Sequence, residues 1–213
     1  MRTIRIAGAD PAGAAAEARS ALEGAIAGGR VVLFPADGVY GLACEPLSAA
    51  AIGRIYALKG RDDGKPAAIL YFSPLAMREL LPSLGPRTRV AIGALLPGPL
   101  TLVVANPDRR YPLACREDPE RLGIRLIEGP LAGVAVPVFQ TSANRSGEPP
   151  ASRFDRIDPE IVQSVDLAID GGELSGSPST VVDLTALERG GAPEILREGA
   201  IDADELVRRL EAA

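Results

Sequence analysis

Short apolar runs alternate with amphipathic stretches along this chain of 213 residues. The run 31–34 is short and wholly apolar, which is typical of a buried strand. Before it, Asp10-Pro11 supplies an N-cap and a proline at the first helical position, so a helix is predicted from there to Ile26. Ser48 is a second N-cap candidate, and apolar residues recur at helical spacing as far as Leu58. The first part of the chain therefore predicts two helices separated by strand.

The remainder of the chain continues this alternation. Further strands are predicted at 39–44, 67–72, 100–105, 122–127, 137–141, 167–169, 180–184 and 194–196. Further helices are predicted to begin at Ser73-Pro74, at Pro86, after Gly129-Pro130, at Asp158-Pro159 and at Asp202. Alternating strands and helices predict an α/β fold, and the short strands near the C-terminal end predict a twisted, mixed, open sheet with flanking helices. No linker-like stretch interrupts the chain, so we expect a single domain over residues 1–213.

The amino-acid composition limits the kinds of protein and of catalytic site that this chain can form. No apolar run approaches the roughly 20 residues that a membrane-spanning helix needs, and the N-terminal stretch does not resemble a signal peptide. Cys44 and Cys115 are too few for a disulfide scaffold, which favours reduced thiols and a cytoplasmic location. The chain has no histidine, so the commonest general base and metal ligand is excluded. If the protein is an enzyme, we expect it to act by positioning and electrostatics, with Mg²⁺ carried in on a nucleotide.

Net charge bears on nucleic-acid binding. The formal charge of −5 disfavours a protein whose main task is to hold duplex nucleic acid, because such proteins are usually basic. A local basic patch remains compatible with this value.

A cationic segment follows the second predicted helix. Lys59, Arg61 and Lys65 lie within seven residues, beside Gly60 and Gly64. The guanidinium of Arg61 suits bidentate phosphate binding, and the two lysines suit point-charge contacts. The alternative interpretation is a solvated charged loop between a helix and a strand.

A second polar segment follows the strand predicted at 137–141. Ser142, Asn144 and Ser146 offer hydroxyl and amide groups at the end of a strand, where α/β folds place their ligands. Serine, asparagine and glycine are also the residues of ordinary tight turns, which is the alternative interpretation. Arg125 stands inside an otherwise apolar strand, where a buried charge needs an anionic partner.

These segments, taken in order, resemble the YrdC-like threonylcarbamoyl-AMP synthase family, whose pattern is Lys-x-Arg followed far downstream by Ser-x-Asn. The resemblance covers nearly the whole chain and rests on Pro35 to Leu42, Lys59-Gly60-Arg61, Leu96 to Leu102, Gly123-Ile124-Arg125, Ser142-Ala143-Asn144, Ser179 to Asp183 and Leu196 to Ile201. It implies an open α/β sheet with a large concave groove.

The resemblance also implies roles for individual residues. ATP, a substrate, would be bound by Lys59, Arg61, Lys65, Ser142, Asn144 and Arg197, with Lys59 and Arg61 as the catalytic pair. The amino-acid substrate would lie against Gly38, Tyr40, Arg125, Ser179 and Thr180, with its carboxylate on Arg125. For Tyr40, a core aromatic residue with a hydrated hydroxyl is an equal alternative.

The implied reaction joins L-threonine, bicarbonate and ATP into threonylcarbamoyl-AMP and pyrophosphate, for the N6-threonylcarbamoyladenosine (t6A37) modification of tRNA. Partners would include tRNA or a downstream threonylcarbamoyl transferase, and no membrane.

The chain departs from the family pattern in its first loop. Ala36 and Gly38 stand where the family has two threonines, and Leu126 to Gly129 replace a common Val-Pro-x-His. A site built to hydrogen-bond a polar group loses discrimination when its partner is removed. Three hypotheses fit: a divergent threonine enzyme, a paralogue that uses another amine or carbamoyl source, and a non-catalytic RNA-binding module that keeps the groove.

Overall fold

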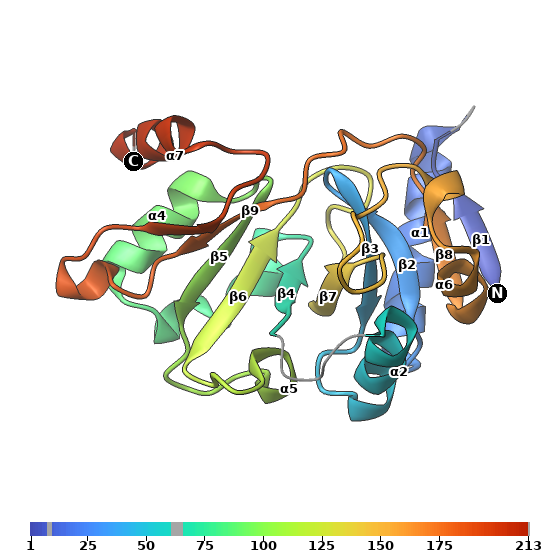
Figure 1. Cartoon of the computed structure of the whole chain (residues 1–213), viewed down its shortest axis with the longest axis horizontal. Coiled ribbons are helices and arrows are strands. Elements are labelled where there is room, and N and C mark those ends of the chain that lie inside the picture. Colours follow the sequence, from blue (N-terminus) through green and yellow to red (C-terminus); the bar gives the residue numbers. More distant parts are fainter. Residues whose placement is uncertain (8–9, 61–65, 213) are drawn as a thin grey trace.

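The computed structural model describes residues 1–7, 10–60 and 66–212, and its centre is one ten-stranded sheet (Figure 1). The spatial order is β1-β8-β2-β3-β7-β4-β6-β5-β9-β10. In chain order the strands are β1 (Arg2–Arg5), β2 (Val32–Ala36), β3 (Val39–Cys44), β4 (Ala68–Tyr71), β5 (Leu100–Ala105), β6 (Arg121–Leu126), β7 (Val138–Ser142), β8 (Leu167–Asp170), β9 (Thr180–Asp183) and β10 (Glu194–Arg197). Parallel and antiparallel pairs alternate irregularly, which confirms the expected mixed α/β sheet.

Helices flank the sheet at both ends. They are α1 (Pro11–Ala27), α2 (Ala49–Lys59), α3 (Pro74–Met77), α4 (Pro86–Leu95), α5 (Pro112–Cys115), α6 (Pro159–Ser164) and α7 (Ala203–Glu211), with short 3₁₀ turns at Leu81–Ser83, Phe154–Arg156 and Leu187–Arg189. In Figure 1, α1, α2 and α6 lie at the β1–β3 end, and α4 and α7 lie at the β5–β10 end. No helix in the described ranges is long and apolar enough to cross a membrane.

The helix starts follow from local chemistry. The Asp10 carboxylate accepts from the Gly13 amide at 3.0 Å, and the Ser48 hydroxyl accepts from the Ala51 amide at 3.2 Å. Each side chain satisfies a backbone donor that the first turn of a helix leaves unpaired. Asp202 caps α7 in the same way.

Two apolar clusters hold the layers together. One joins α1 to β2 and β8 through residues such as Leu22, Phe34 and Ile169, and the other joins α2 and α4 to the opposite face. Strands buried on both faces are apolar throughout, so their short apolar runs are visible in the sequence.

One local expectation needs correction, and two short elements were not predicted from the sequence. Residues 129–133 form turns and not the helix expected after Gly129-Pro130, since Gly129 and Gly133 both have positive φ, of 100° and 93°. The edge strand β1 was not predicted because only Ile4 in it is buried, which leaves no apolar run. The four-residue helix α5 is too short for a periodic signal.

Candidate functional site

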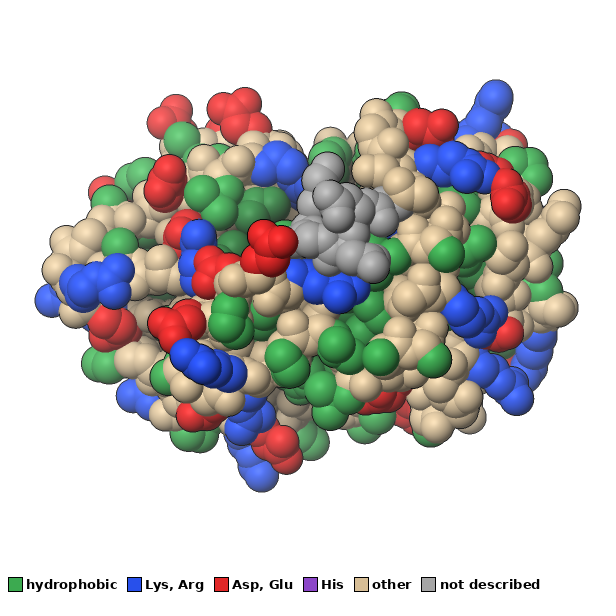
Figure 2. Space-filling model, turned by 60° about the horizontal axis from the view of Figure 1, so that its bottom comes forward, with side chains coloured by type: hydrophobic (Ala, Val, Ile, Leu, Met, Phe, Trp, Pro, Cys, Tyr) green, Lys and Arg blue, Asp and Glu red, His purple; other side chains and the backbone are tan. Residues whose placement is uncertain are grey.

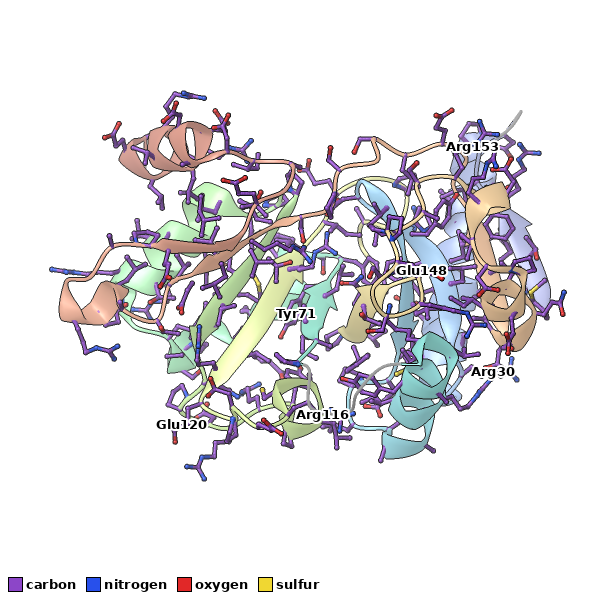
Figure 3. The ribbon with its side chains drawn as sticks, viewed as in Figure 1. Arg30, Tyr71, Arg116, Glu120, Glu148 and Arg153 are labelled. Carbon is purple, nitrogen blue, oxygen red and sulfur yellow. The ribbon has the colours of Figure 1, made fainter. Side chains whose placement is uncertain are left out.

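A groove of about 650 Å³ lies against one face of the sheet, a volume typical of small-molecule sites. Its walls come from strands β4 to β7, from β9 and β10, and from the loop after β7. Successive strand residues point to opposite faces, so Arg121, Gly123 and Arg125 of β6 share the groove side. Figure 3 shows Glu148, another lining residue, on the loop after β7, and Arg116 beside α5.

Lys59 joins the two polar segments that the sequence singled out, although it lies 83 residues before Ser142. The side chain is buried at the end of α2, and its ammonium donates to the carbonyl oxygens of Ser142 and, at 2.7 Å, Asn144. The Ser146 amide in turn donates to the Lys59 carbonyl at 2.8 Å. Lys59 therefore fixes the loop after β7 and brings a positive charge to the groove.

The loop after β7 is held from within and from α6. The Asn144 amide donates to the carbonyls of Arg145 at 2.8 Å and Glu148 at 2.6 Å. Arg145 donates to Asp158 at 2.6 Å, and this hydrogen bond holds the pKa of the Asp158 carboxyl below its usual value. Ser142, Asn144 and Ser146 are thus presented on a braced loop that lines the groove.

Arg125 lines the groove as a buried cation, with 6% of its side chain exposed. Its Nη2 donates to Asp37 at 2.6 Å and its Nη1 to Gln140 at 3.1 Å. Burial lowers the pKa of the Arg125 guanidinium and raises that of the Asp37 carboxyl, and in each case the partner's charge opposes the effect of burial. The anion that Arg125 was expected to need is therefore supplied by the protein.

Arg197 and Ser179 form a neighbouring cluster. The Arg197 Nη2 donates to the Ser179 carbonyl at 2.6 Å and to its hydroxyl at 3.2 Å. That hydroxyl also bonds the Thr101 hydroxyl at 2.9 Å, and all three residues line the groove. Arg197 is close enough to Arg125 for its charge to lower the pKa of the latter. This end of the groove therefore carries two cations, and Asp37 pairs with one of them.

Two of the predicted substrate residues lie outside the groove lining. The Tyr40 ring is fully buried, and its hydroxyl donates to the Gly172 carbonyl at 2.8 Å. The interpretation as a core aromatic residue therefore describes Tyr40, although its hydroxyl meets protein groups. The Thr180 hydroxyl donates to the Ile201 carbonyl at 2.6 Å and accepts from the Ile201 amide, so it holds the chain end against β9.

Gly38 also lies outside the groove lining, because a loop covers it. A Cβ built on Gly38 would stand 2.7 Å from the Ser175 hydroxyl and closer still to the Ser177 carbonyl oxygen. The Gly176 amide donates to the Gly38 carbonyl at 2.9 Å. A threonine in this position would collide with the loop 175–177, so the glycine is required by the local packing.

The remaining predicted residues, Arg61 and Lys65, lie outside the described residues. Conversely, the groove includes Thr101, Gln140 and Arg121, which sequence reasoning missed. Strand alternation could have found Gln140, since it stands two residues before Ser142 and must share its face. The described ranges contain no group of three or more acidic or cysteine side chains placed to hold a metal ion.

Comparison with known proteins shows to which family the chain belongs. A family model described as "Telomere recombination", covering Sua5, YciO and YrdC, matches residues 24–199. The chain belongs to this family. Two threonylcarbamoyl-AMP synthases are among its relatives. The chain is 34% identical to that of Nitrosococcus oceani over 166 residues, 74% of this chain and 88% of the relative. It is 33% identical to that of Chromohalobacter salexigens over 167 residues, 75% of this chain and 89% of the relative.

Solved structures of the family agree with the fold. P. abyssi Sua5, determined in complex with L-threonine, superposes with a TM-score of 0.79 at 27% identity. The match covers 98% of this chain and 60% of that one. E. coli YciO has a TM-score of 0.75 at 22% identity, over 96% of this chain and 98% of that one. The expected YrdC-like architecture is thus confirmed.

Proposed function

We propose that this protein is an enzyme that joins L-threonine, bicarbonate and ATP into threonylcarbamoyl-AMP, with release of pyrophosphate. The observation that carries the proposal is the placement of two cationic clusters in one groove: Lys59 with the Ser142–Asn144 loop, and Arg125 with Arg197. The reaction needs a place for a triphosphate and a place for an amino acid next to each other. The names of the relatives and the threonine bound to P. abyssi Sua5 support the same activity.

The chemistry suits a chain without histidine. The deprotonated amine of threonine attacks the bicarbonate carbon, a C–N bond forms and water leaves, which gives a carbamate. A carbamate oxygen then attacks the α-phosphorus of ATP, and the bond to the bridging oxygen breaks as pyrophosphate leaves. No covalent bond to the protein is required, so alignment and charge neutralisation supply the catalysis.

The described residues would divide this work between the two ends of the groove. Lys59 holds the Ser142–Asn144 loop in shape and adds positive charge for the phosphates, together with Arg61 and Lys65, whose roles remain predictions. Arg197 would contact the nucleotide, and Arg125 with Ser179 would hold the amino-acid carboxylate. Mg²⁺ bound to ATP would neutralise charge on the leaving pyrophosphate.

The first test is pyrophosphate release from ATP, bicarbonate and Mg²⁺, with and without L-threonine, with the adenylate identified by mass spectrometry. Lys59→Met should lower kcat/KM by roughly 100-fold or more, as the loss of one charged group that stabilises a transition state does. Arg54→Met is the matched control, because it removes a cation from the same helix that pairs with Asp166 away from the groove. Lys59→Met with wild-type turnover would refute the assignment.

A second candidate is a paralogue that uses another amine, and it is favoured by Ala36 and Gly38, which stand where the family has two threonines. A screen of amines for ATP-dependent pyrophosphate release separates the two. If threonine is the amine, tRNA or a downstream threonylcarbamoyl transferase in the cytoplasm would consume the product. The face in Figure 2 carries acidic and basic side chains side by side, which gives no support to a module that only binds RNA.

A further inference from the structure

Two protein side chains hold the guanidinium of Arg125. Its Nη1 is bonded to Gln140 and its Nη2 to Asp37, while Nε is buried and has no hydrogen-bond partner in the described part of the chain. A carboxylate binds arginine best through two parallel hydrogen bonds to one edge. Of the two present partners only Asp37 carries a negative charge, so an incoming carboxylate competes with Asp37 for the guanidinium.

Asp37 is the partner that is placed to leave. It stands at the tip of the β2–β3 hairpin, between the paired residues Ala36 and Val39, and 20% of its side chain is exposed. Its φ is +62°, a conformation that residues with a Cβ adopt rarely, although Asp and Asn tolerate it best. Gln140, in contrast, lies in the middle of the sheet, where β7 is paired on both sides.

We propose that Asp37 is the resting counter-ion of Arg125 and a specificity residue: the carboxylate of the amino substrate binds by displacing it. The inference rests on the proposed function only in that the groove accepts an amino acid. Exchanging one carboxylate for another keeps the buried arginine neutralised throughout, and a buried charge without a partner is strongly unfavourable. An amine without a carboxylate cannot make the exchange, so Asp37 excludes such amines from Arg125.

The affinity for the substrate then depends on a difference in binding free energy between two carboxylates, that of the substrate and that of Asp37, which compete for Arg125. Removal of the internal competitor should strengthen binding of every small amino acid that uses Arg125. Were Asp37 instead a direct contact for the substrate's ammonium group, its removal would weaken binding. The two roles therefore predict opposite signs for one substitution.

Direct binding tests the proposal without any need for turnover. Isothermal titration would compare L-threonine with 1-amino-2-propanol, which is the same amine without the carboxylate, on wild type and Asp37→Asn. We expect threonine to bind at least about fivefold more tightly to Asp37→Asn, within the usual range of coupling between competing sites, and 1-amino-2-propanol to be unaffected. Asp183→Asn is the matched control. Asp183 pairs with Arg121, which lies on β6 as Arg125 does, and we expect this variant to leave threonine binding unchanged.

Unchanged or weaker threonine binding by Asp37→Asn would overturn the proposal, as would an equal gain for both ligands. Asp37→Gly is the second variant in case the first folds poorly, because glycine accepts a positive φ. Glycine and L-serine extend the titration beyond threonine. If wild type shows no threonine-dependent pyrophosphate release but Asp37→Asn gains affinity for any of these amino acids, the proposed reaction fails while the counter-ion role stands. If neither protein binds any of them, the counter-ion role fails.

Discussion

Adding a single methyl group at Gly38 tests how the loop before β9 packs on the β2–β3 hairpin. Gly38 is buried and its φ is not positive, so alanine brings no backbone strain of its own. The new Cβ would stand 3.0 Å from the Ser177 carbonyl carbon, 2.7 Å from the Ser175 hydroxyl and nearer still to the Ser177 oxygen. Ordinary contacts of a Cβ begin at 3.4 Å, so the loop must move away.

The expected loss of stability has two sources. Overpacking of a closed site destabilises by about 1–3 kcal/mol. Movement of the loop also weakens the bond from the Gly176 amide to the Gly38 carbonyl, which contributes about 1 kcal/mol. We therefore expect Gly38→Ala to lower the free energy of unfolding by roughly 2–4 kcal/mol.

Urea unfolding measures this loss of stability, and the control variant is expected to change the free energy of unfolding in the opposite direction. Gly24 lies exposed in α1, and a Cβ there meets nothing within 4 Å. Gly24→Ala should raise the free energy of unfolding by about 0.5–1 kcal/mol, because alanine is the better helix former. A Gly38→Ala variant as stable as wild type would show that the loop does not pack on the hairpin, and the explanation for the missing threonine would fall with it.

Two further predictions concern titratable groups. Hydrogen bonds from Thr88 lower the pKa of the Glu188 carboxyl, so its stabilising contribution is present above the ordinary value of 4.5 and is lost as the pH falls through the lowered one. Glu188→Gln should then lower the urea midpoint at pH 7, and this loss should shrink as the pH falls below 4.5; a loss that does not change with pH would contradict the electrostatic origin. Burial raises the pKa of the Cys44 thiol to about 12, and burial also raises the pKa of the Cys115 thiol above its ordinary value. Neither thiol should therefore react with Ellman's reagent at pH 8 until urea unfolds the chain. Rapid reaction of the native protein would show that the thiols are accessible.

The sequence predicted well the features that depend on neighbouring residues. Runs of apolar residues located β2 to β9, and the caps Asp10, Ser48 and Asp202 located helix starts. The family pattern also predicted that the segments around Lys59 and Ser142 lie together, as they do. These features require only local periodicity or an ordered set of motifs.

Partners that are distant in sequence could not be predicted. The sequence indicated that Arg125 needs an anion, but Asp37 lies 88 residues away and reaches it only because β3, β7, β4 and β6 are consecutive in the sheet. Tyr40 is another case, since its hydroxyl meets Gly172, 132 residues later, across β2 and β8. Strand order decides both contacts, and single-sequence patterns do not encode strand order.

Packing at the hairpin tip accounts for one of the two departures from the family's first loop, the glycine at position 38. Asp37 pairs with the guanidinium of Arg125, and Gly38 makes room for the loop that leads to Ser179. The Ser175 hydroxyl lies 2.7 Å from the point where a side chain at position 38 would begin, so a hydroxyl group returns to this place from a distant part of the chain. The loss of a threonine there therefore leaves a hydroxyl group in this place, and another segment of the chain supplies it.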